Sequence, residues 1–396
     1  MFKFFSLLYK TKINKSIYHF MLGYIIICSV LFSTSLNAQK KDSTSHKDKD
    51  KPIVLNGKDG PYIINDTLYR VNAKNKLLTV PEFLSDSLVI RADNVDNDEF
   101  YLKLRSKYIP SKSTFQPSEK MMVISDIEGK YNAFSSFLFA NQVIDENHNW
   151  VYGKGKLVLV GDFVDRGKNV TQVLWLIYKL EQQALKAGGK VHFILGNHEV
   201  LNFQGNHTYN RGKYIKVAQE ISGKKNKTEA IKYIYSDQSE LGSWLLTKNV
   251  IEKIGDYLFV HAGLSPEILD YKLSLEDINQ KMRLHYVQGQ LKPSDTTRFL
   301  YGSKGPIWYR GLVTARPQYS KIVQAELDEI LNFYNAKKMV IGHSVVNTVS
   351  SDFKGKVIRV DVSHGSKKFS GRTKGLLIEN GKEYVVDDKG SKTPLN

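Results

Sequence analysis

The sequence contains a single cysteine among its 396 residues, Cys28, and this residue lies within an apolar run near the N-terminus. One cysteine cannot form a disulfide within the chain, and it offers no cluster of thiolates to a metal. The sequence also lacks a repeat with a period of about 20–50 residues, which excludes a solenoid or propeller built from such repeats. A chain of this length can bury a large core, so packing is sufficient to hold the fold together.

Acidic residues are in the minority, because 40 aspartates and glutamates face 57 lysines and arginines, for a formal net charge of +17. Such a surface attracts anions, such as phosphate esters, nucleic acid or an acidic membrane. The lysines are scattered, however, and no long basic stripe is interleaved with aromatic residues, so there is no clear nucleic-acid-binding motif. Lysine used for solubility explains the charge more simply.

Residues 1–38 have the pattern of a signal peptide. A basic stretch is followed by an apolar core from Met21 to Leu36 and then by small and polar residues. The core is near the length of a signal-peptide core and short for a membrane span. We therefore predict cleavage after Ala38 and export to the periplasm or the outside of the cell. A retained membrane anchor is the alternative.

The remainder of the chain divides by composition into three parts. Residues 39–52 are polar and charged without periodicity, which predicts a disordered linker. Residues 53–119 contain short β-rich runs separated by turn residues, which predicts a small N-terminal extension. Across residues 120–396, buried strands alternate with amphipathic helices, one of them expected over residues 239–254. This alternation predicts an α/β layered fold.

Most of the strands predicted after residue 120 end in the same way, with an aspartate, asparagine or histidine followed by glycine or a turn. In open α/β sheets the ligand site lies at the carboxyl ends of the strands. Each residue alone has an ordinary structural explanation, but chance does not place the whole set at successive strand ends. Eight side chains from five strands should therefore converge on one cleft: Asp126, Glu128, Asp162, Asp165, Asn197, His198, His261 and His343.

The chemistry of this set favours metal binding. Oxygen and imidazole ligands without thiolate suit manganese, iron, zinc or magnesium. Two such ions about 3.5–4 Å apart can hold both the attacking and the leaving oxygen of a phosphoryl group and activate a bridging water. The set has enough ligands for two ions.

The motifs "SDIEG", "GDFVDRG", "GNHE", "HAGLSP" and "GHS" resemble those of the calcineurin-like metallophosphoesterases, and more narrowly those of the phosphoprotein phosphatase superfamily. "GPIWYRG" and "NAKKMVIGHSVV" are similar to its Shewanella-like bacterial branch. The resemblance covers about residues 120–365, which makes residues 120–396 the catalytic domain, and leaves residues 39–119 outside. It implies a two-sheet β-sandwich flanked by helices.

The resemblance also implies a role for each residue. Asp126 would bind a first metal, Asp162 would bridge the two metals, and Asn197, His261 and His343 would hold the second. His198, paired with Asp165, would be the general acid that protonates the leaving oxygen. The residues expected to bind the substrate phosphate are Arg166, Arg310 and Asn197.

Glu128 departs from the family pattern, which usually has a histidine at this position. We expect Glu128 to bind the first metal through oxygen, and a carboxylate there favours manganese or magnesium over zinc. A decayed first site, which would leave a mononuclear enzyme or a pseudoenzyme, is the rival interpretation.

Together these features predict an exported phosphomonoesterase in which a metal-bridging hydroxide attacks phosphorus, with phosphorylated serine, threonine or tyrosine as the substrate. Two alternatives remain open. One is a hydrolase of nucleotides, dinucleoside polyphosphates or phosphodiesters, because the same metal centre serves many esters. The other is a non-catalytic module that binds metal or phosphate. Residues 206–235 are either a lid over the site or a solvated helix pair, and His364 is a further histidine near a strand end.

Overall fold

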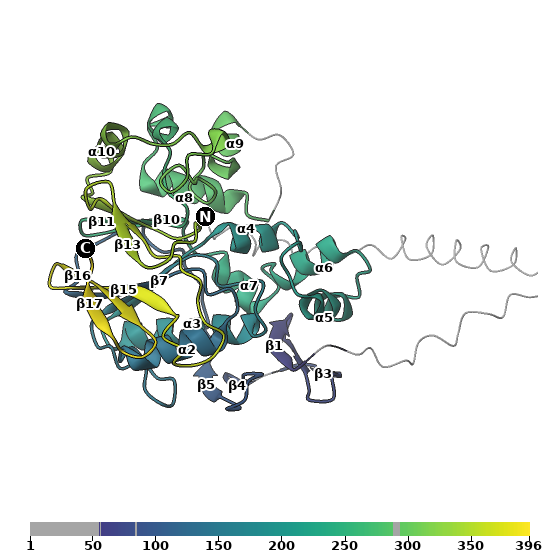
Figure 1. Cartoon of the computed structure of the whole chain (residues 1–396). Helices are drawn as coiled ribbons and strands as arrows, with labels where there is room; N and C mark the ends of the chain where they lie inside the picture. Colours follow the sequence, from purple (N-terminus) through teal and green to yellow (C-terminus); the bar gives the residue numbers. More distant parts are fainter. Residues whose placement is uncertain (1–54, 56, 84, 288–293) are drawn as a thin grey trace, which may run out of the picture. The chain divides into compact units, whose positions relative to one another are not determined.

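The computed structural model describes residues 55, 57–83, 85–287 and 294–396 (Figure 1). The signal peptide expected over residues 1–38 and the linker expected over residues 39–52 lie outside this part of the chain. None of the helices in the described residues has both the length and the apolar character that a membrane crossing requires.

Two six-stranded sheets form the centre of the fold, which agrees with the predicted two-sheet β-sandwich. The first sheet has the order β17 (Lys392–Pro394), β16 (Lys382–Asp387), β15 (Lys374–Glu379), β7 (Lys120–Ile124), β8 (Lys156–Val160) and β9 (Lys190–Ile194). The second sheet has the order β13 (Ser350–Asp352), β14 (Val357–Arg359), β12 (Lys338–Ile341), β11 (Tyr257–Val260), β10 (Ile251–Ile254) and β6 (Thr114–Phe115). Strands β7, β8 and β9 are mutually parallel, and so are β11, β12 and β14, so their carboxyl ends share one edge in each sheet.

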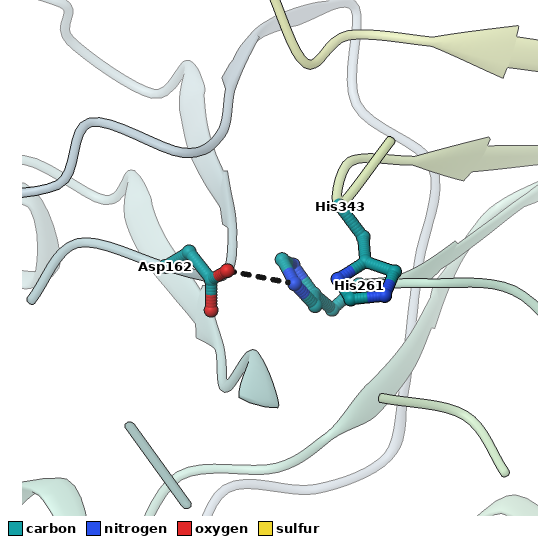
Figure 2. Close-up of side chains that lie close together, drawn as sticks. All are labelled: Asp162, His261 and His343. Atoms are coloured by element: carbon teal, nitrogen blue, oxygen red, sulfur yellow. Dashed lines mark ion pairs between the residues drawn. The ribbon is translucent and has the colours of Figure 1, made fainter. Parts of the chain in front are cut away.

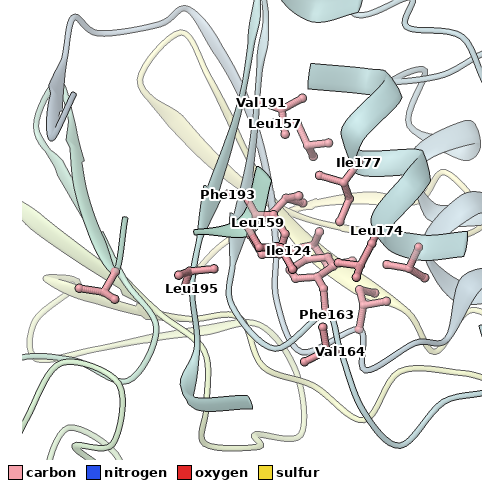
Figure 3. Packing of buried hydrophobic residues seen from close by; sticks show 14 of the residues in the cluster. Ile124, Leu157, Leu159, Phe163, Val164, Leu174, Ile177, Val191, Phe193 and Leu195 are labelled. Carbon is pink, nitrogen blue, oxygen red and sulfur yellow. The ribbon is translucent and has the colours of Figure 1, made fainter. Parts of the chain in front are cut away.

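The strands are apolar on both faces because each face packs against a different layer. Val123 of β7 belongs to a buried cluster that contains Phe259 of β11, so this cluster joins the two sheets. The next residue, Ile124, belongs to a second cluster with Leu174 and Ile177 of the adjacent helix α3 (Figure 3). Successive side chains of a strand point to opposite faces, so one buried strand contributes to both layers.

Helices cover the outer faces of the two sheets. In Figure 1, α2 and α3 lie along the sheet that contains β7, and α8, α9 and α10 lie beyond the sheet that contains β10. The α-helices are α2 (Tyr131–Ala140), α3 (Val170–Lys186), α4 (Asn197–Phe203), α5 (Gly212–Ser222), α6 (Lys227–Ile234), α7 (Glu240–Leu245), α8 (Leu275–Leu284), α9 (Asp295–Tyr301) and α10 (Gln324–Phe333). Two short 3₁₀ helices are η1 (Pro266–Tyr271) and η2 (Pro317–Tyr319).

The helix predicted over residues 239–254 is wrong in its second half. Helix α7 ends at Leu245, and β10 then pairs antiparallel with β11 across Gly255 and Asp256. A two-residue loop of this type is a hairpin signal. The strand forms because β10 completes the second sheet between β11 and β6.

The short strands expected within residues 53–119 are present, and they pack directly on the sandwich. Strands β1 (Asp59–Ile64), β2 (Thr67–Val71) and β3 (Leu77–Val80) form one small sheet, and β4 (Ser87–Arg91) and β5 (Glu99–Lys103) form another. The Trp175 indole on α3 donates a hydrogen bond to the Pro61 carbonyl at 2.9 Å, and the Gln172 amide donates to the Gly60 carbonyl at 3.0 Å. The extension therefore shares a hydrophobic core and a polar contact surface with the sandwich.

Candidate active site

The ends of four strands meet at one open pocket. Asp126 and Glu128 follow β7, Asp162 follows β8, Asn197 and His198 follow β9, and His343 follows β12. These side chains line the pocket together with Arg166 and Arg310, while His261 contacts Asp162 and Asp165 contacts His198. The structure thus brings together all eight side chains that the sequence places at strand ends.

The backbone at these strand ends has a conformation that side-chain-bearing residues rarely adopt. Asp126, Asp162 and His343 have φ values of 52°, 61° and 63°. Such conformations persist only where the surrounding structure imposes them, and they are frequent at functional sites. The backbone N–H of Asp126 donates to the Gly161 carbonyl at 2.9 Å, which ties the β7 and β8 ends together.

Two glycines of the motifs allow neighbouring strand ends to approach each other. A Cβ at Gly196 would collide with the Asp162 carboxylate, and a Cβ at Gly161 would collide with the His261 ring. Only glycine fits at such close approaches. The glycines of "GNHE" and "GDFVDRG" are therefore required by packing at the site.

Glu199 of "GNHE" holds the Asp162 loop from behind. Its buried carboxylate accepts hydrogen bonds from the backbone N–H groups of Asp162 at 3.0 Å, Phe163 at 2.7 Å and Gly196 at 2.8 Å. These three donors satisfy a fully buried carboxylate. Glu199 fixes the backbone that carries Asp162.

Three buried side chains, Asp162, His261 and His343, form a group that fits a metal ion (Figure 2). Each offers one ligand atom, and these atoms lie within 4.8 Å of one another. His343 Nε2 is buried and has no hydrogen-bond partner within the described residues. An unpaired buried nitrogen costs free energy unless something binds to it. Carboxylate and imidazole donors of this kind suit divalent manganese, iron or zinc.

His261 shows the same need for a cation. Its Nδ1 donates to the Val160 carbonyl at 2.8 Å, and its Nε2 lies 3.2 Å from Asp162 Oδ2 and 3.0 Å from Asn197 Oδ1. A nitrogen lone pair facing two oxygens is repelled unless a proton or a metal ion lies between them. Burial lowers the pKa of His261, but the Asp162 carboxylate raises it more, to about 9. The site attracts positive charge.

Glu128 lies at the edge of the pocket between two cations. Its carboxylate is paired with Arg166 and lies 3.6 Å from Lys130 Nζ. Burial raises the pKa of Glu128, and the two cations oppose this shift. Arg166, which the resemblance places on the substrate phosphate, therefore contacts Glu128, and its half-exposed side chain still lines the pocket.

His198 and Asp165 form the pair that the resemblance implies. His198 Nδ1 lies 2.7 Å from Asp165 Oδ2, and the other ring nitrogen, Nε2, lies 3.7 Å from Asp162 Oδ2. The second oxygen of Asp165 accepts hydrogen bonds from the side-chain amides of Asn202, at 3.1 Å, and Asn210. Burial lowers the pKa of His198, whereas Asp162 and Asp165 raise it, to about 9 overall. The two carboxylates therefore favour the protonated form of His198.

Aromatic rings and Arg310 frame the mouth of the pocket. Arg310 Nη1 donates to the His343 carbonyl at 2.8 Å and to Ser344 Oγ at 3.1 Å. The Tyr209 ring lies 4.6 Å from the His198 ring, centroid to centroid, and Trp308 also lines the pocket. Tyr209 belongs to the segment of residues 206–235, which also contains α5 and α6, so part of this insert reaches the site.

Comparison with known proteins agrees with this geometry. The sequence profile of the calcineurin-like phosphoesterases matches residues 120–347, which is more than half of the chain. The chain belongs to the calcineurin-like phosphoesterase family. It is therefore a metal-dependent hydrolase of phosphate esters.

Several relatives of this phosphoesterase are named as protein phosphatases. It is 30% identical over 244 residues to Shewanella-like protein phosphatase 1 of Plasmodium berghei. The aligned residues cover 61% of this chain and 66% of that protein. It is 26% identical over 292 residues to Shewanella-like protein phosphatase 2 of Arabidopsis thaliana, covering 63% and 73%. The crystal structure of a cold-active protein-tyrosine phosphatase from a psychrophilic Shewanella species superposes with a TM-score of 0.75 at 32% identity, covering 86% of this chain and all of that one.

The structural likeness corrects one expectation about the N-terminal extension. Residues 39–119 were expected to lie outside the resemblance. The likeness to the Shewanella enzyme covers 86% of the chain, a share that residues 120–396 alone cannot supply. The extension is therefore shared, at least in part, with the Shewanella enzyme.

Sequence reasoning missed several residues of this phosphoesterase site. Asp361 follows β14 and lines the pocket, whereas the residue named from the sequence was His364. His364 is buried beneath the site, where its Nε2 lies 2.8 Å from the Ser125 carbonyl. Asp361 also lies just beyond a strand, but Val362 follows it and not a glycine or a turn, so the strand-end pattern was only a partial signal. Asn202, Asn210 and Tyr209 have no such signal.

Proposed function

We propose that this phosphoesterase hydrolyses phosphate monoesters on serine, threonine or tyrosine side chains with the help of two divalent metal ions. The observation that carries the proposal is the meeting of the Asp162–His261–His343 group with the His198–Asp165 pair in one pocket. The relatives named as protein phosphatases support the choice of substrate.

The donor atoms suggest how two ions would be held. Asp126, Glu128 and Asp162 would hold one, and Asp162, Asn197, His261 and His343 would hold the other. When bound, the ions would neutralise phosphate oxygens and lower the pKa of the attacking water. The many carboxylates on the Asp126 side favour manganese or magnesium there, and we propose manganese.

The side chains of the pocket would carry the remaining tasks. His198 would donate the proton on Nε2 to the leaving oxygen, and Asp165 would stabilise the proton that remains on Nδ1. Arg166, Arg310 and Asn197 would bind the phosphate oxygens, since guanidinium groups match the geometry of phosphate. Tyr209 and Trp308 offer aromatic surfaces to the group that carries the phosphate.

The test is a substrate panel with manganese-loaded protein. It compares nitrophenyl phosphate, bis(nitrophenyl) phosphate, phosphoserine and phosphotyrosine peptides, and a dinucleoside tetraphosphate. We expect the monoesters to be hydrolysed with the highest kcat/KM. Preference for the diester or the dinucleoside tetraphosphate would make the alternative hydrolase the correct function. Metal binding without turnover of any ester would make the chain a binding module.

We further propose that the enzyme is exported, because of the signal-peptide pattern of residues 1–38. Expression of the full chain in an exporting bacterium should yield a mature protein in the periplasm whose N-terminal residue is Gln39. An intact N-terminus in the membrane fraction would indicate a retained anchor, and cytoplasmic protein with the intact N-terminus would refute export.

A further inference from the structure

Asp361 is a buried carboxylate without a hydrogen-bond donor or a cation of its own. It lies two residues beyond the end of β14, is 3% exposed and lines the same pocket as Asp126 and Asp162. Val346 donates its backbone N–H to the Asp361 carbonyl at 2.9 Å, which fixes the main chain. The side-chain carboxylate accepts no hydrogen bond and forms no ion pair anywhere in the described part of the chain.

Other buried acids of this protein have such partners. The Asp388 carboxylate accepts from the Ser370 and Gly371 backbone N–H groups at 2.9 and 2.7 Å. Glu252 contacts a ring nitrogen of His192 at 2.6 Å. A buried carboxylate without partners is costly, and unpaired buried groups are rare in native proteins. Asp361 differs from these acids in facing the pocket without a partner.

The surroundings of Asp361 indicate what it lacks. Burial and the charges of Asp162 and Glu128 raise the pKa of Asp361, against weaker effects of Lys130 and Arg310, and its net value is about 8. Asp361 in turn is the largest charge that raises the pKa of Asp126, after burial itself. Four carboxylates that share one pocket repel one another unless a cation lies among them.

Glu128 and Asp361 are in different situations, although both face the pocket. Glu128 is already paired with Arg166 and Lys130. Asp361 has no ion pair within the residues that the structure describes, so its oxygens are free to bind a metal ion. Of the two acids, Asp361 is the one whose charge is left uncompensated.

We propose that Asp361 is a metal-binding carboxylate of this enzyme, which acts with Asp126 and Asp162 on the ion at that side of the pocket. This inference rests on the metal centre of the proposed function. The Asp361 carboxylate would add a hard oxygen ligand to the first metal site, where Glu128 replaces the histidine usual in the family. It also explains why an unpaired acid is retained in a buried position.

The test measures manganese binding and metal-free stability in the same set of variants. Protein stripped with a chelator is titrated with Mn²⁺ by calorimetry, its metal content is measured after desalting, and its Tm is recorded without metal. Asp361→Ala should weaken binding of at least one manganese ion by about tenfold or more, since even indirect partners of metal ligands have effects of this size. The same variant should raise the metal-free Tm, because removing one acid relieves repulsion.

Asp361→Asn keeps the shape of the side chain and guards against loss of the fold. It should also weaken binding and raise the metal-free Tm. Ser363→Ala, an exposed neighbour on the same pocket wall, is the matched control and should leave both quantities unchanged.

The outcomes separate this inference from the proposed function. Wild-type manganese affinity in both Asp361 variants would overturn the inference and leave the metal centre intact. A fall in both metal affinity and metal-free Tm would assign Asp361 a purely structural role and would also overturn it. A wild-type protein that binds no manganese would overturn the metal centre of the proposed function itself.

Discussion

At the scale of single residues, each polar side chain of the site is oriented by a second group. Asp165 orients His198, the Val160 carbonyl orients His261, and Glu199 holds the backbone of Asp162. Such partners fix which nitrogen carries a proton and where each oxygen points. The chemistry of the pocket therefore depends on residues outside it.

His198→Ala should remove the proton donor without removing the metal. The expected fall in kcat is roughly 10²–10⁴-fold, the usual contribution of a general acid. Metal content should stay at the wild-type value because His198 is not part of the Asp162–His261–His343 group. Steady-state kinetics and elemental analysis measure both quantities, and His285→Ala, at the end of α8, serves as the control. Loss of metal in the His198 variant would contradict this role.

Asn210→Ala should weaken the support of the same proton donor. Asn210 donates to Asp165, and a hydrogen bond to a charged group is worth about 1.5–3 kcal/mol. We expect kcat to fall by about tenfold with KM unchanged, since only the orientation of the pair is affected. Asn147→Ala, an exposed asparagine distant in sequence, should have no effect. An unchanged kcat in Asn210→Ala would show that Asn202 alone is sufficient.

Sequence reasoning identified the residues whose position relative to a strand carries the signal. Asp126, Asp162 and His261 could be predicted because each ends a buried strand. Asp361 also follows a strand, but the direction in which a side chain points after a strand is decided by the fold, and His364 was chosen in its place. Asn210 could not be predicted, because it belongs to an insert and reaches Asp165 only through the folding of the chain.

At the scale of secondary-structure elements, one partly buried ionic cluster joins helix α3 to its neighbours. Glu181 of α3 lies 2.8 Å from Lys248 Nζ, just after α7, and 2.9 Å from Arg105 Nη2 in the N-terminal extension. Trp244 of α7 donates its indole N–H to the same carboxylate at 2.6 Å. The Glu181 carboxylate therefore links α3 to the end of α7 and to the N-terminal extension.

This cluster predicts how stability depends on pH. Burial raises the pKa of Glu181, but Lys248 and Arg105 lower it more, to about 2. Because the folded pKa lies below the unfolded value of about 4.3, the stabilisation is complete above that value and is lost as the pH falls toward 2. Burial lowers the pKa of Lys248, so the desolvation of its ammonium offsets part of the gain.

Glu181→Gln should therefore lower the free energy of unfolding near pH 7 by about 2–3 kcal/mol. The difference between variant and wild type should shrink between about pH 4.3 and pH 2. Denaturant unfolding at several pH values measures this difference in free energy. Glu146→Gln, which replaces an exposed acid, is the control. A difference that does not change across this range would contradict the account.

Element boundaries show where local patterns were insufficient. The periodicity of residues 239–254 favoured one helix, yet β10 forms because the second sheet needs a strand beside β11. The Gly255-Asp256 pair was a local hairpin signal that the helical pattern concealed. Strands β7, β8 and β9 were predicted correctly because buried parallel strands are apolar throughout.

At the scale of the whole molecule, the N-terminal extension could not be placed from the sequence. Its contacts with the sandwich, such as Trp175 with Pro61, join residues more than a hundred positions apart. The α/β sandwich could be predicted, because the alternation of strands and helices restricts the possible layers. Tyr62 of β1 also bonds to Thr171 of α3 at 3.2 Å, next to the loop that carries Asp165 and Arg166.

The central claim is that distant strand ends create one metal centre that hydrolyses phosphate monoesters. The most direct measurement follows nitrophenyl phosphate hydrolysis and metal content through chelation and re-addition of manganese. The account predicts that chelation abolishes activity and that activity returns as the protein takes up two ions per chain. Hydrolysis that continues in metal-free protein would contradict it, as would a protein that regains full activity with one ion per chain.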